Sequence, residues 1–283
     1  MTTADDRAGY ERRIEGHYAP TDIPSRILEC LRAAGREPER LTREDTAAFD
    51  EFHGGGREST RALARFAALE PGLRILDIGS GIGGPARTLA AEFGATVTGI
   101  DLTSGFVQAA VLLSGLLGMA HSVDFVHGSA LDLPFVDASF DVVWSQNMLM
   151  NIEDKPRLFA EIARVLKPGG RFAFEALLEK SGEPLHFPCF WAAEPALSFL
   201  LGAAPLRAAL GAAGLAERLW EDNTPAVIEL GKRRLAAMER GDAPPLGIGV
   251  IVPHDVVAKA RNVLRNNVEG RTAAIQAVFV RAG

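Results

Sequence analysis

The residues of this chain with the clearest chemical pattern are an acid and a glycine-rich turn that end one apolar segment. The stretch from Ile75 to Gly84 reads ILDIGSGIGG. Because glycine has no side chain, such a turn after a parallel strand lets a ligand lie against bare backbone. Gly79 and Gly81 open a G-x-G-x-x-G pattern of the kind found in dinucleotide folds. Asp77, however, stands two residues before the first glycine, where its charge would repel a pyrophosphate and suit a cationic ligand.

A second acid ends the next apolar segment. Residues 97–101 read VTGID and come about 20 residues after the glycine turn. In doubly wound nucleotide folds, an acid at this position hydrogen-bonds the hydroxyl groups of a ribose. We therefore predict that Asp101 is a ribose ligand, and the alternative is that it only caps the following helix.

Three further segments complete an ordered series of strands and turns. A strand at residues 123–127 leads into GSALDLPF, and a strand at residues 140–147 reads FDVVWSQN. The turn LKPGG at residues 166–170 ends a helix and precedes a strand at residues 171–176. Over residues 72–178 the chain resembles the class I S-adenosylmethionine-dependent methyltransferases. This resemblance implies an α/β fold with a doubly wound, Rossmann-like, seven-stranded sheet whose last strand is antiparallel.

S-adenosylmethionine is the cofactor that the resemblance implies, and its sulfonium and ammonium charges suit the acid at position 77. We expect the residues after the third strand to border adenine, and those after the fourth to meet the methionine moiety. For each group the alternative is an ordinary turn or loop. The predicted cofactor-binding residues are Asp77, Gly79, Gly81, Asp101, Leu102, Ser129, Ala130, Leu131, Gln146 and Asn147.

A narrower resemblance is carried by short segments outside that core. FHGGGREST at residues 52–60, WSQN at 144–147 and FPCFWA at 187–192 are similar to the bacterial sarcosine/dimethylglycine N-methyltransferase-like group. That group also includes natural-product tailoring enzymes. Two positions depart from its pattern, because Asn151 stands where a histidine is usual and Ser129 replaces the acid that receives the adenine amino group.

The catalytic base is the least determined part of the prediction. Of the six histidines, His53 and His186 fall in segments expected to cover the site, so either is a candidate to take a proton or orient the acceptor. Tyr18, Glu175 and Asn151 are comparable alternatives. A neutral amine needs no strong base, which favours N-methylation. The sequence has no metal-ligand spacing, and we expect no metal.

Outside the core, the chain has three additional pieces. Residues 1–60 are expected to form an N-terminal helical lid segment, and residues 61–283 the methyltransferase domain with cap insertions near 179–206 and 224–270. We expect the two insertions and the N-terminal segment to meet above the carboxyl ends of the strands, where such sheets bind ligands. Phe187, Phe190 and Trp191 would then line an acceptor pocket or serve only as lid packing.

Composition excludes several classes of function. A net charge of −6 argues against nucleic acid as a partner. The polar, acidic start argues against a secretory signal, and the most apolar stretch, residues 195–206, is too short to span a bilayer. Cys30 and Cys189 are expected to be reduced, buried thiols, which fits a cytoplasmic location. The oligomeric state stays open.

The sequence thus predicts an enzyme that transfers a methyl group from S-adenosylmethionine to a small-molecule acceptor, at a nitrogen of an amine or secondary metabolite. O- or C-methylation of a natural product remains an alternative. So does a catalytically silent protein that binds the cofactor. A nicotinamide-dependent oxidoreductase would share only the glycine turn, and it would give no reason for Asp77 or for the turn at residues 166–170.

Overall fold

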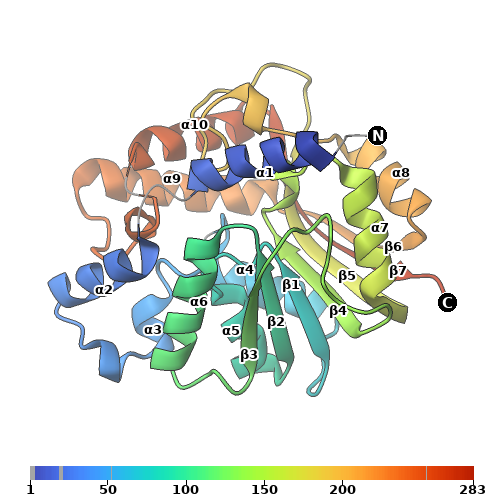
Figure 1. Ribbon diagram of the computed structural model, residues 1–283. Coiled ribbons are helices and arrows are strands. Elements are labelled where there is room, and N and C mark those ends of the chain that lie inside the picture. Colours follow the sequence, from blue (N-terminus) through green and yellow to red (C-terminus); the bar gives the residue numbers. More distant parts are fainter. Residues whose placement is uncertain (1–3, 19–21, 52, 253) are drawn as a thin grey trace.

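The predicted sheet is present and has seven strands (Figure 1). The structure is a computed structural model that describes residues 4–18, 22–51, 53–252 and 254–283. The strands are β1 (Arg74–Ile78), β2 (Thr96–Asp101), β3 (Val123–His127), β4 (Phe140–Gln146), β5 (Leu166–Glu179), β6 (Leu215–Asp222) and β7 (Thr272–Arg281). Their order is β3-β2-β1-β4-β5-β7-β6, and β7 runs antiparallel to both of its neighbours. The expected fold class is therefore confirmed.

Helices cover both faces of the sheet, and a separate apolar cluster lies under each set. One set is α4 (Gly56–Phe66), α5 (Gly84–Phe93) and α6 (Ser104–Leu116), which pack over a cluster that includes Trp144. The other set is α7 (Lys155–Val165) and α8 (Ala203–Ala212), over a cluster that includes Phe172. Apolar burial on both faces explains why the central strands are continuous apolar runs rather than alternating ones.

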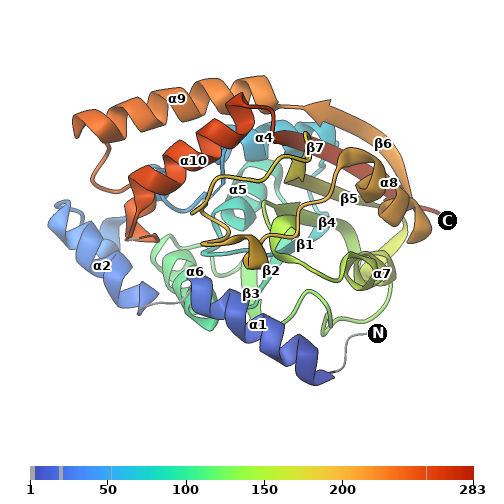
Figure 2. The ribbon, with the colours of Figure 1, turned by 90° about the horizontal axis from the view of Figure 1, so that it is seen from above.

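A third layer lies over one end of the sheet. It contains α1 (Ala4–Tyr18), α9 (Thr224–Arg240) and α10 (Val256–Val268), together with the segment between β5 and α8 (Figure 1). Seen from above, α1 and α9 lie on opposite sides of this layer, with α10 between them (Figure 2). Beside it, α2 (Ile23–Ala33) packs on α6, and the short α3 (Arg43–Thr46) precedes α4.

Most elements lie where the sequence predicts them, and the differences have local causes. Helix α1 lies within the N-terminal segment expected to be helical, but its own bounds could not be predicted, because its only buried side chains among those described are Tyr10 and Ile14, too few for an apolar stripe. Helix α4 begins at Gly56, so the expected boundary at residue 60 falls inside a helix that packs on the sheet.

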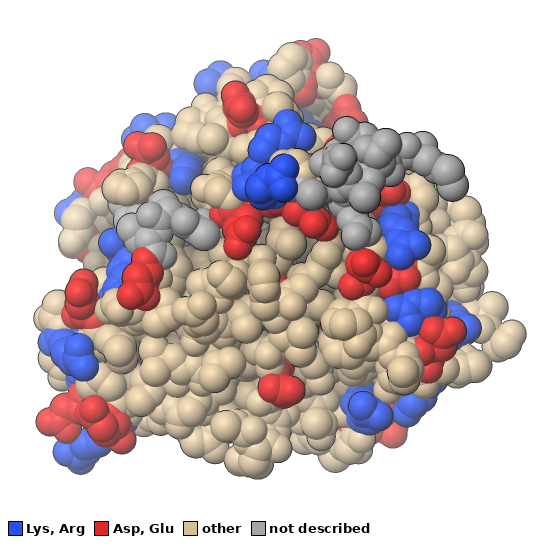
Figure 3. Space-filling view, in the orientation of Figure 1, with Lys and Arg blue, Asp and Glu red and all other residues tan. Residues whose placement is uncertain are grey.

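The surface fits the composition. On the face drawn in Figure 3, lysine and arginine are intermixed with aspartate and glutamate rather than gathered in one basic area. No helix in the described part of the chain is long and apolar enough to cross a membrane.

Candidate active site

A cavity of about 690 Å³ opens at the carboxyl ends of the strands, beneath the third layer. Its walls come from the turns after β1, β2, β3 and β4, from α1, and from α9 and α10. All the predicted cofactor-binding residues except Asp77 line it: Gly79, Gly81, Asp101, Leu102, Ser129, Ala130, Leu131, Gln146 and Asn147. The structure therefore brings together residues that are far apart in the chain, since Gly79 and Asn147 are separated by 68 positions.

The glycine turn has the backbone geometry that its residues suggest. Gly79 and Gly81 have positive φ angles of 74° and 53°, a region that favours glycine. A Cβ atom on Gly79 would lie 2.6 Å from Cγ of Met148, so a larger residue is excluded there. The amide of Gly81 donates to Oδ2 of Asp101 at 2.8 Å, which links the turn after β1 to the acid that ends β2.

Asp101 faces the cavity at the end of β2. Its second carboxylate oxygen accepts a hydrogen bond from the Thr103 amide at 2.8 Å, so the carboxylate is fixed by backbone on both sides. Burial raises the pKa of Asp101, while these two amides oppose the rise. Each carboxylate oxygen has two lone pairs, and capacity therefore remains to accept from a ribose hydroxyl.

Asp77 lies behind the glycine turn rather than in the cavity wall. Its side chain is 1% exposed, and Oδ2 has no hydrogen-bond partner among the described residues. Burial raises the pKa of Asp77 to about 8, and the charges of Asp101 and Glu51 add to the effect. A buried carboxyl without a partner is costly to ionise, so a nearby cation would stabilise its charged form.

His53 lines the cavity between two buried carboxylates. Its Nε2 lies 3.0 Å from Oε2 of Glu51, and its Nδ1 lies 3.6 Å from Oε1 of Glu175. Burial of the imidazole opposes the charged form, but the two carboxylates outweigh it and raise the pKa of His53 to about 9. At neutral pH the ring is therefore an imidazolium that donates protons in hydrogen bonds, which argues against a role as general base.

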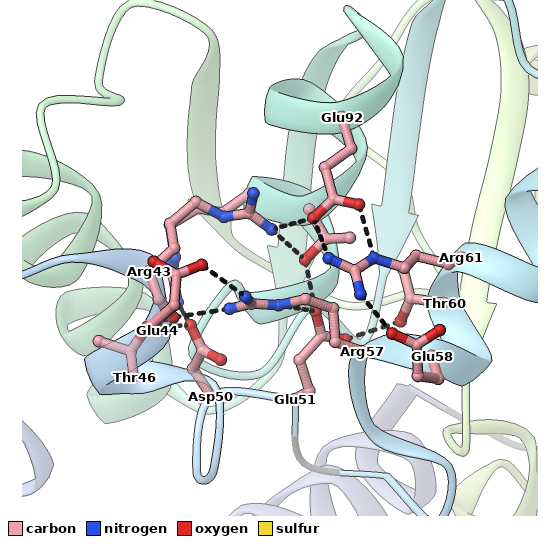
Figure 4. Close-up of polar contacts among 12 residues, drawn as sticks. Arg43, Glu44, Thr46, Asp50, Glu51, Arg57, Glu58, Thr60, Arg61 and Glu92 are labelled. Atoms are coloured by element: carbon pink, nitrogen blue, oxygen red, sulfur yellow. Dashed lines mark hydrogen bonds and ion pairs between the residues drawn. The ribbon is translucent and has the colours of Figure 1, made fainter.

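Glu51 is held in place from several elements (Figure 4). The Thr60 hydroxyl of α4 donates to Oε2 at 2.7 Å, and the Thr88 hydroxyl of α5 donates to Oε1 at 2.5 Å. The Arg57 guanidinium lies 3.8 Å from the same carboxylate. Burial alone would raise the pKa of Glu51, but these hydrogen bonds and His53 hold it at about 2. The segment before α4 is thus fastened to both α4 and α5.

Glu175 forms the opposite side of the imidazole site. It accepts hydrogen bonds from Ser59 and from the side-chain amide of Gln276, the latter at 3.0 Å. The side-chain amide of Asn147 lies 3.4 Å from its other oxygen. Burial opposes ionisation, but His53 and these donors lower the pKa of Glu175. The carboxylate is therefore charged at the cavity wall.

The two predicted polar residues after β4 are only partly available to a ligand. The side-chain oxygen of Gln146 accepts a hydrogen bond from the Trp144 indole at 2.9 Å and lies 3.0 Å from the Thr60 hydroxyl. Its amide nitrogen lies 3.4 Å from Nδ1 of His53. Asn147 has a positive φ of 52°, which turns its side chain toward Glu175. Both residues stabilise the wall as well as lining it.

Asn151 joins α1 to the segment after β5. Its carbonyl oxygen accepts from the Tyr10 hydroxyl, and its side-chain oxygen accepts from the Tyr18 hydroxyl at 2.9 Å. Its side-chain nitrogen donates to the Trp191 carbonyl at 2.8 Å. Both tyrosines of the chain thus fasten α1 to this residue, and Phe190 and Trp191 line the cavity next to it.

His186 lies outside the cavity. Its Nε2 contacts the Glu269 carboxylate at 2.8 Å, and its backbone amide donates to the Asn266 side chain at 2.9 Å. These contacts attach the segment after β5 to α10. His186 is not among the residues that line the cavity, and its ring is paired with Glu269 instead.

Sequence reasoning missed the acids that complete the site. Glu51 is two residues before His53, but its role depends on partners in α4 and α5 that no local pattern reveals. Glu11 and Tyr10 of α1 also line the cavity. Over the described ranges, no group of three or more histidine, cysteine, aspartate or glutamate side chains could hold a metal ion. Phe52 of the segment FHGGGREST lies outside the described residues.

The sheet order, the antiparallel β7 and the ligand turns at the strand ends define a class I methyltransferase fold. Residues 76–174 match the family model described as a methyltransferase domain. Residues 76–174 therefore carry a methyltransferase domain, and the expected resemblance to S-adenosylmethionine-dependent methyltransferases is confirmed.

Two curated relatives are similar over part of the chain. Glycine/sarcosine/dimethylglycine N-methyltransferase from Actinopolyspora halophila is 40% identical over 119 residues, which are 41% of this chain and 21% of the relative. Phosphoethanolamine N-methyltransferase 3 from Arabidopsis thaliana is 30% identical over 200 residues, 66% of this chain and 37% of the relative. The chain thus spans well under half the length of these relatives.

Solved structures with a similar fold cover nearly the whole chain. Geranyl diphosphate C-methyltransferase from Streptomyces coelicolor, in complex with Mg²⁺, geranyl diphosphate and S-adenosyl-L-homocysteine, has a TM-score of 0.71 and 18% identity over 96% of this chain and 98% of its own. The cyclase SpnF has a TM-score of 0.68 and 23% identity over 96% and 97%. At these identities the likeness establishes the fold alone.

Proposed function

We propose that the chain transfers a methyl group from S-adenosylmethionine to a nitrogen of a small-molecule amine with a largely apolar body. The observation that carries this proposal is the carboxyl of Asp77, which is buried behind a glycine turn that opens onto the cavity and whose Oδ2 has no hydrogen-bond partner among the described residues. A cationic cofactor supplies the charge that such a carboxyl lacks. When bound, S-adenosylmethionine supplies a methyl group on a sulfonium, which is already an activated leaving group.

The residues around the cavity fit the parts of that cofactor. In this proposal Asp101 would accept from the ribose hydroxyls, and Gly79 and Gly81, which line the cavity, would leave room for the methionine end against bare backbone. Ser129–Leu131 would border the adenine at the end of β3. The nicotinamide alternative gives no account of Asp77, because a pyrophosphate would add negative charge beside a buried carboxyl.

The remainder of the cavity is suited to an apolar acceptor. The sides of α9 and α10 that face it carry Val227, Met238, Val256, Val263 and Leu264. Helix α1 adds Ile14 and its two tyrosines, and the segment after β5 adds Phe190 and Trp191. Such walls exclude water and orient an acceptor, and orientation alone contributes about 7–11 kcal/mol in favourable cases.

The state of His53 favours an amine as the acceptor. An alcohol must lose its proton during attack and needs a base, but His53 is held as an imidazolium between Glu51 and Glu175. An amine can lose its proton to water before it binds. The N-methyltransferases among the relatives support the same assignment. A secondary metabolite would fit the apolar walls.

C-methylation is the second candidate. The ionised carboxylate of Glu175 stands at a largely apolar cavity wall, where it would stabilise positive charge that develops on an alkene carbon. The fold neighbour that methylates carbon in geranyl diphosphate supports this alternative. A cyclase is among the fold neighbours, so the same fold serves another reaction, and a protein that binds the cofactor without methyl transfer is a third candidate.

Methyl transfer from isotopically labelled S-adenosylmethionine to a panel of apolar amines and isoprenoids separates these functions. We expect labelled N-methyl products, formed with one S-adenosylhomocysteine per methyl, and slower product formation by Asp101→Ala at cofactor concentrations below saturation. Label on carbon, located by NMR, would favour the second candidate. Cofactor binding without product from any acceptor in the panel would contradict the proposed activity.

A further inference from the structure

Helix α1 brings a carboxylate to the end of β3. The Ser129 hydroxyl donates to Oε1 of Glu11 at 2.6 Å, across 118 positions of the chain. Ser129 also accepts a hydrogen bond from the Leu131 amide at 3.2 Å. Both Glu11 and Ser129 line the cavity, so this contact is part of its wall.

The contact changes what the end of β3 offers a ligand. The single hydroxyl proton of Ser129 is engaged by Glu11, and the neighbouring side chains of Ala130 and Leu131 are apolar. A carboxylate has about four acceptor positions in its two oxygens, and the bond from Ser129 occupies one of them. Among the described residues that line the β2 and β3 end of the cavity, the acidic side chains are Asp101 and Glu11.

The position of Glu11 is defined by its neighbours on α1. Tyr10, the preceding residue, donates to the Asn151 carbonyl, and Tyr18, two turns later, donates to the Asn151 side chain. Ile14 is buried against the same side of the molecule. The helix is therefore fastened at points before and after the carboxylate, which fixes Glu11 over the end of β3.

We propose that Glu11 accepts a hydrogen bond from the exocyclic amino group of the cofactor's adenine, so that α1 supplies part of the cofactor site. This inference rests on the proposed function. If Asp101 holds the ribose at the end of β2, the base extends toward β3, the adjacent strand at the edge of the sheet. The amino group needs an acceptor there, and a carboxylate is a strong one. Because Glu11 belongs to a helix that covers the cavity, its hydrogen bond to adenine would also help to hold α1 over the cavity.

Ligand discrimination tests this assignment. We would measure the affinity of S-adenosylhomocysteine and of its analogue that has hydrogen in place of the adenine 6-amino group. The wild type should prefer the amino-bearing ligand by about tenfold or more. In Glu11→Ala that preference should vanish, with both ligands bound equally. Glu15→Ala, on the same helix but not in the cavity wall, is the matched control and should keep the preference.

A second variant separates recognition from lid attachment. Ser129→Asp in the Glu11→Ala background places a carboxylate on the loop itself and should restore the preference for the 6-amino ligand. If Glu11→Ala weakens both ligands by the same factor, or changes neither, Glu11 only fastens α1 and the inference is overturned. If the wild type binds neither S-adenosylmethionine nor S-adenosylhomocysteine, the proposed function itself fails, which is a distinguishable outcome.

Discussion

His53 and Glu51 are two positions apart in the chain, and their side chains lie 3.0 Å apart in the wall of the cavity. The backbone amide of His53 also donates to the Glu51 carbonyl at 2.8 Å, so the two residues are joined through both backbone and side chain. With Glu175 on its other face, the imidazole becomes a buried cation between two anions. A histidine chosen from the sequence as a base is thus held in the wrong protonation state for one.

Removing this cation should destabilise the fold. His53→Gln leaves two carboxylates buried without their shared counter-charge, which we expect to lower the free energy of unfolding by about 3–5 kcal/mol. Urea unfolding at pH 6 measures the change. His186→Gln removes a partly exposed histidine from its pair with Glu269 and should cost about 1 kcal/mol or less. Equal losses for the two variants would contradict a buried charged cluster at His53.

The pH dependence of that difference has a defined sign. The folded pKa of His53, about 9, lies above the ordinary histidine pKa of about 6.5, so its contribution is complete below about 6.5 and is lost as the pH rises through 9. The stability gap between wild type and His53→Gln should therefore shrink from pH 6 to pH 9. A gap that grows over this range would show that His53 is neutral in the folded state.

Cofactor binding should release a proton from Asp77. In the free protein burial raises the pKa of this carboxyl to about 8, so at pH 7 it is mostly protonated, and a cation beside it favours ionisation. The affinity for S-adenosylmethionine should accordingly rise with pH from 6 to 7.5, by at most about tenfold per pH unit. Calorimetry in buffers with different heats of ionisation measures the released proton.

Asp77→Asn should release no proton and should lose this pH dependence, whereas Asp137→Asn, at an exposed pair with Arg164, should keep both. Identical proton release in wild type and Asp77→Asn would show that Asp77 is not the group that loses a proton when the cofactor binds.

Phe190 should affect the acceptor more than the cofactor. Its side chain lines the cavity, whereas Phe187 packs outside it against the small apolar cluster around Trp191. Phe190→Ala should lower kcat/KM for the acceptor by about tenfold or more and change cofactor affinity little. Phe187→Ala, which removes the same side chain behind the wall, is the matched control and should leave kcat/KM for the acceptor nearly unchanged.

The substitution Trp191→Ala changes both the lining of the cavity and the stability of the fold, because Trp191 lines the cavity and is buried. Trp191 is 4% exposed, and its indole donates to Ser198 at 2.9 Å, so we expect a loss of about 3–5 kcal/mol of stability. If Phe190→Ala weakens the cofactor and the acceptor equally, the acceptor pocket lies elsewhere.

The parts of this site that could be predicted are those whose sequence pattern lies in consecutive residues. A turn that follows a buried strand places its residues at the sheet edge whatever the rest of the chain does, and so Gly79, Gly81 and Asp101 could be assigned to one cavity. The same reasoning predicts the two insertions, because they interrupt a regular alternation of strands and helices.

The contacts that were not predictable join distant segments. Glu51 becomes a partner of His53 only because α4 and α5 supply the hydroxyls of Thr60 and Thr88. Helix α1 has too few apolar residues for the sequence to show where it packs. Its position depends on hydrogen bonds from two tyrosine hydroxyls to Asn151. His53 and His186 could not be separated in sequence either, since both stand beside glycine- or proline-rich cover segments.

The claim on which the others depend is that the cavity beside Asp77 and Asp101 binds S-adenosylmethionine. Calorimetric titration of the wild type and Asp101→Ala with S-adenosylhomocysteine tests it most directly. We predict one site per chain in the wild type and a loss of about 1.5–3 kcal/mol of binding free energy in Asp101→Ala, about tenfold to 100-fold in affinity. No binding by the folded wild type, or the same affinity in a folded Asp101→Ala, would contradict it.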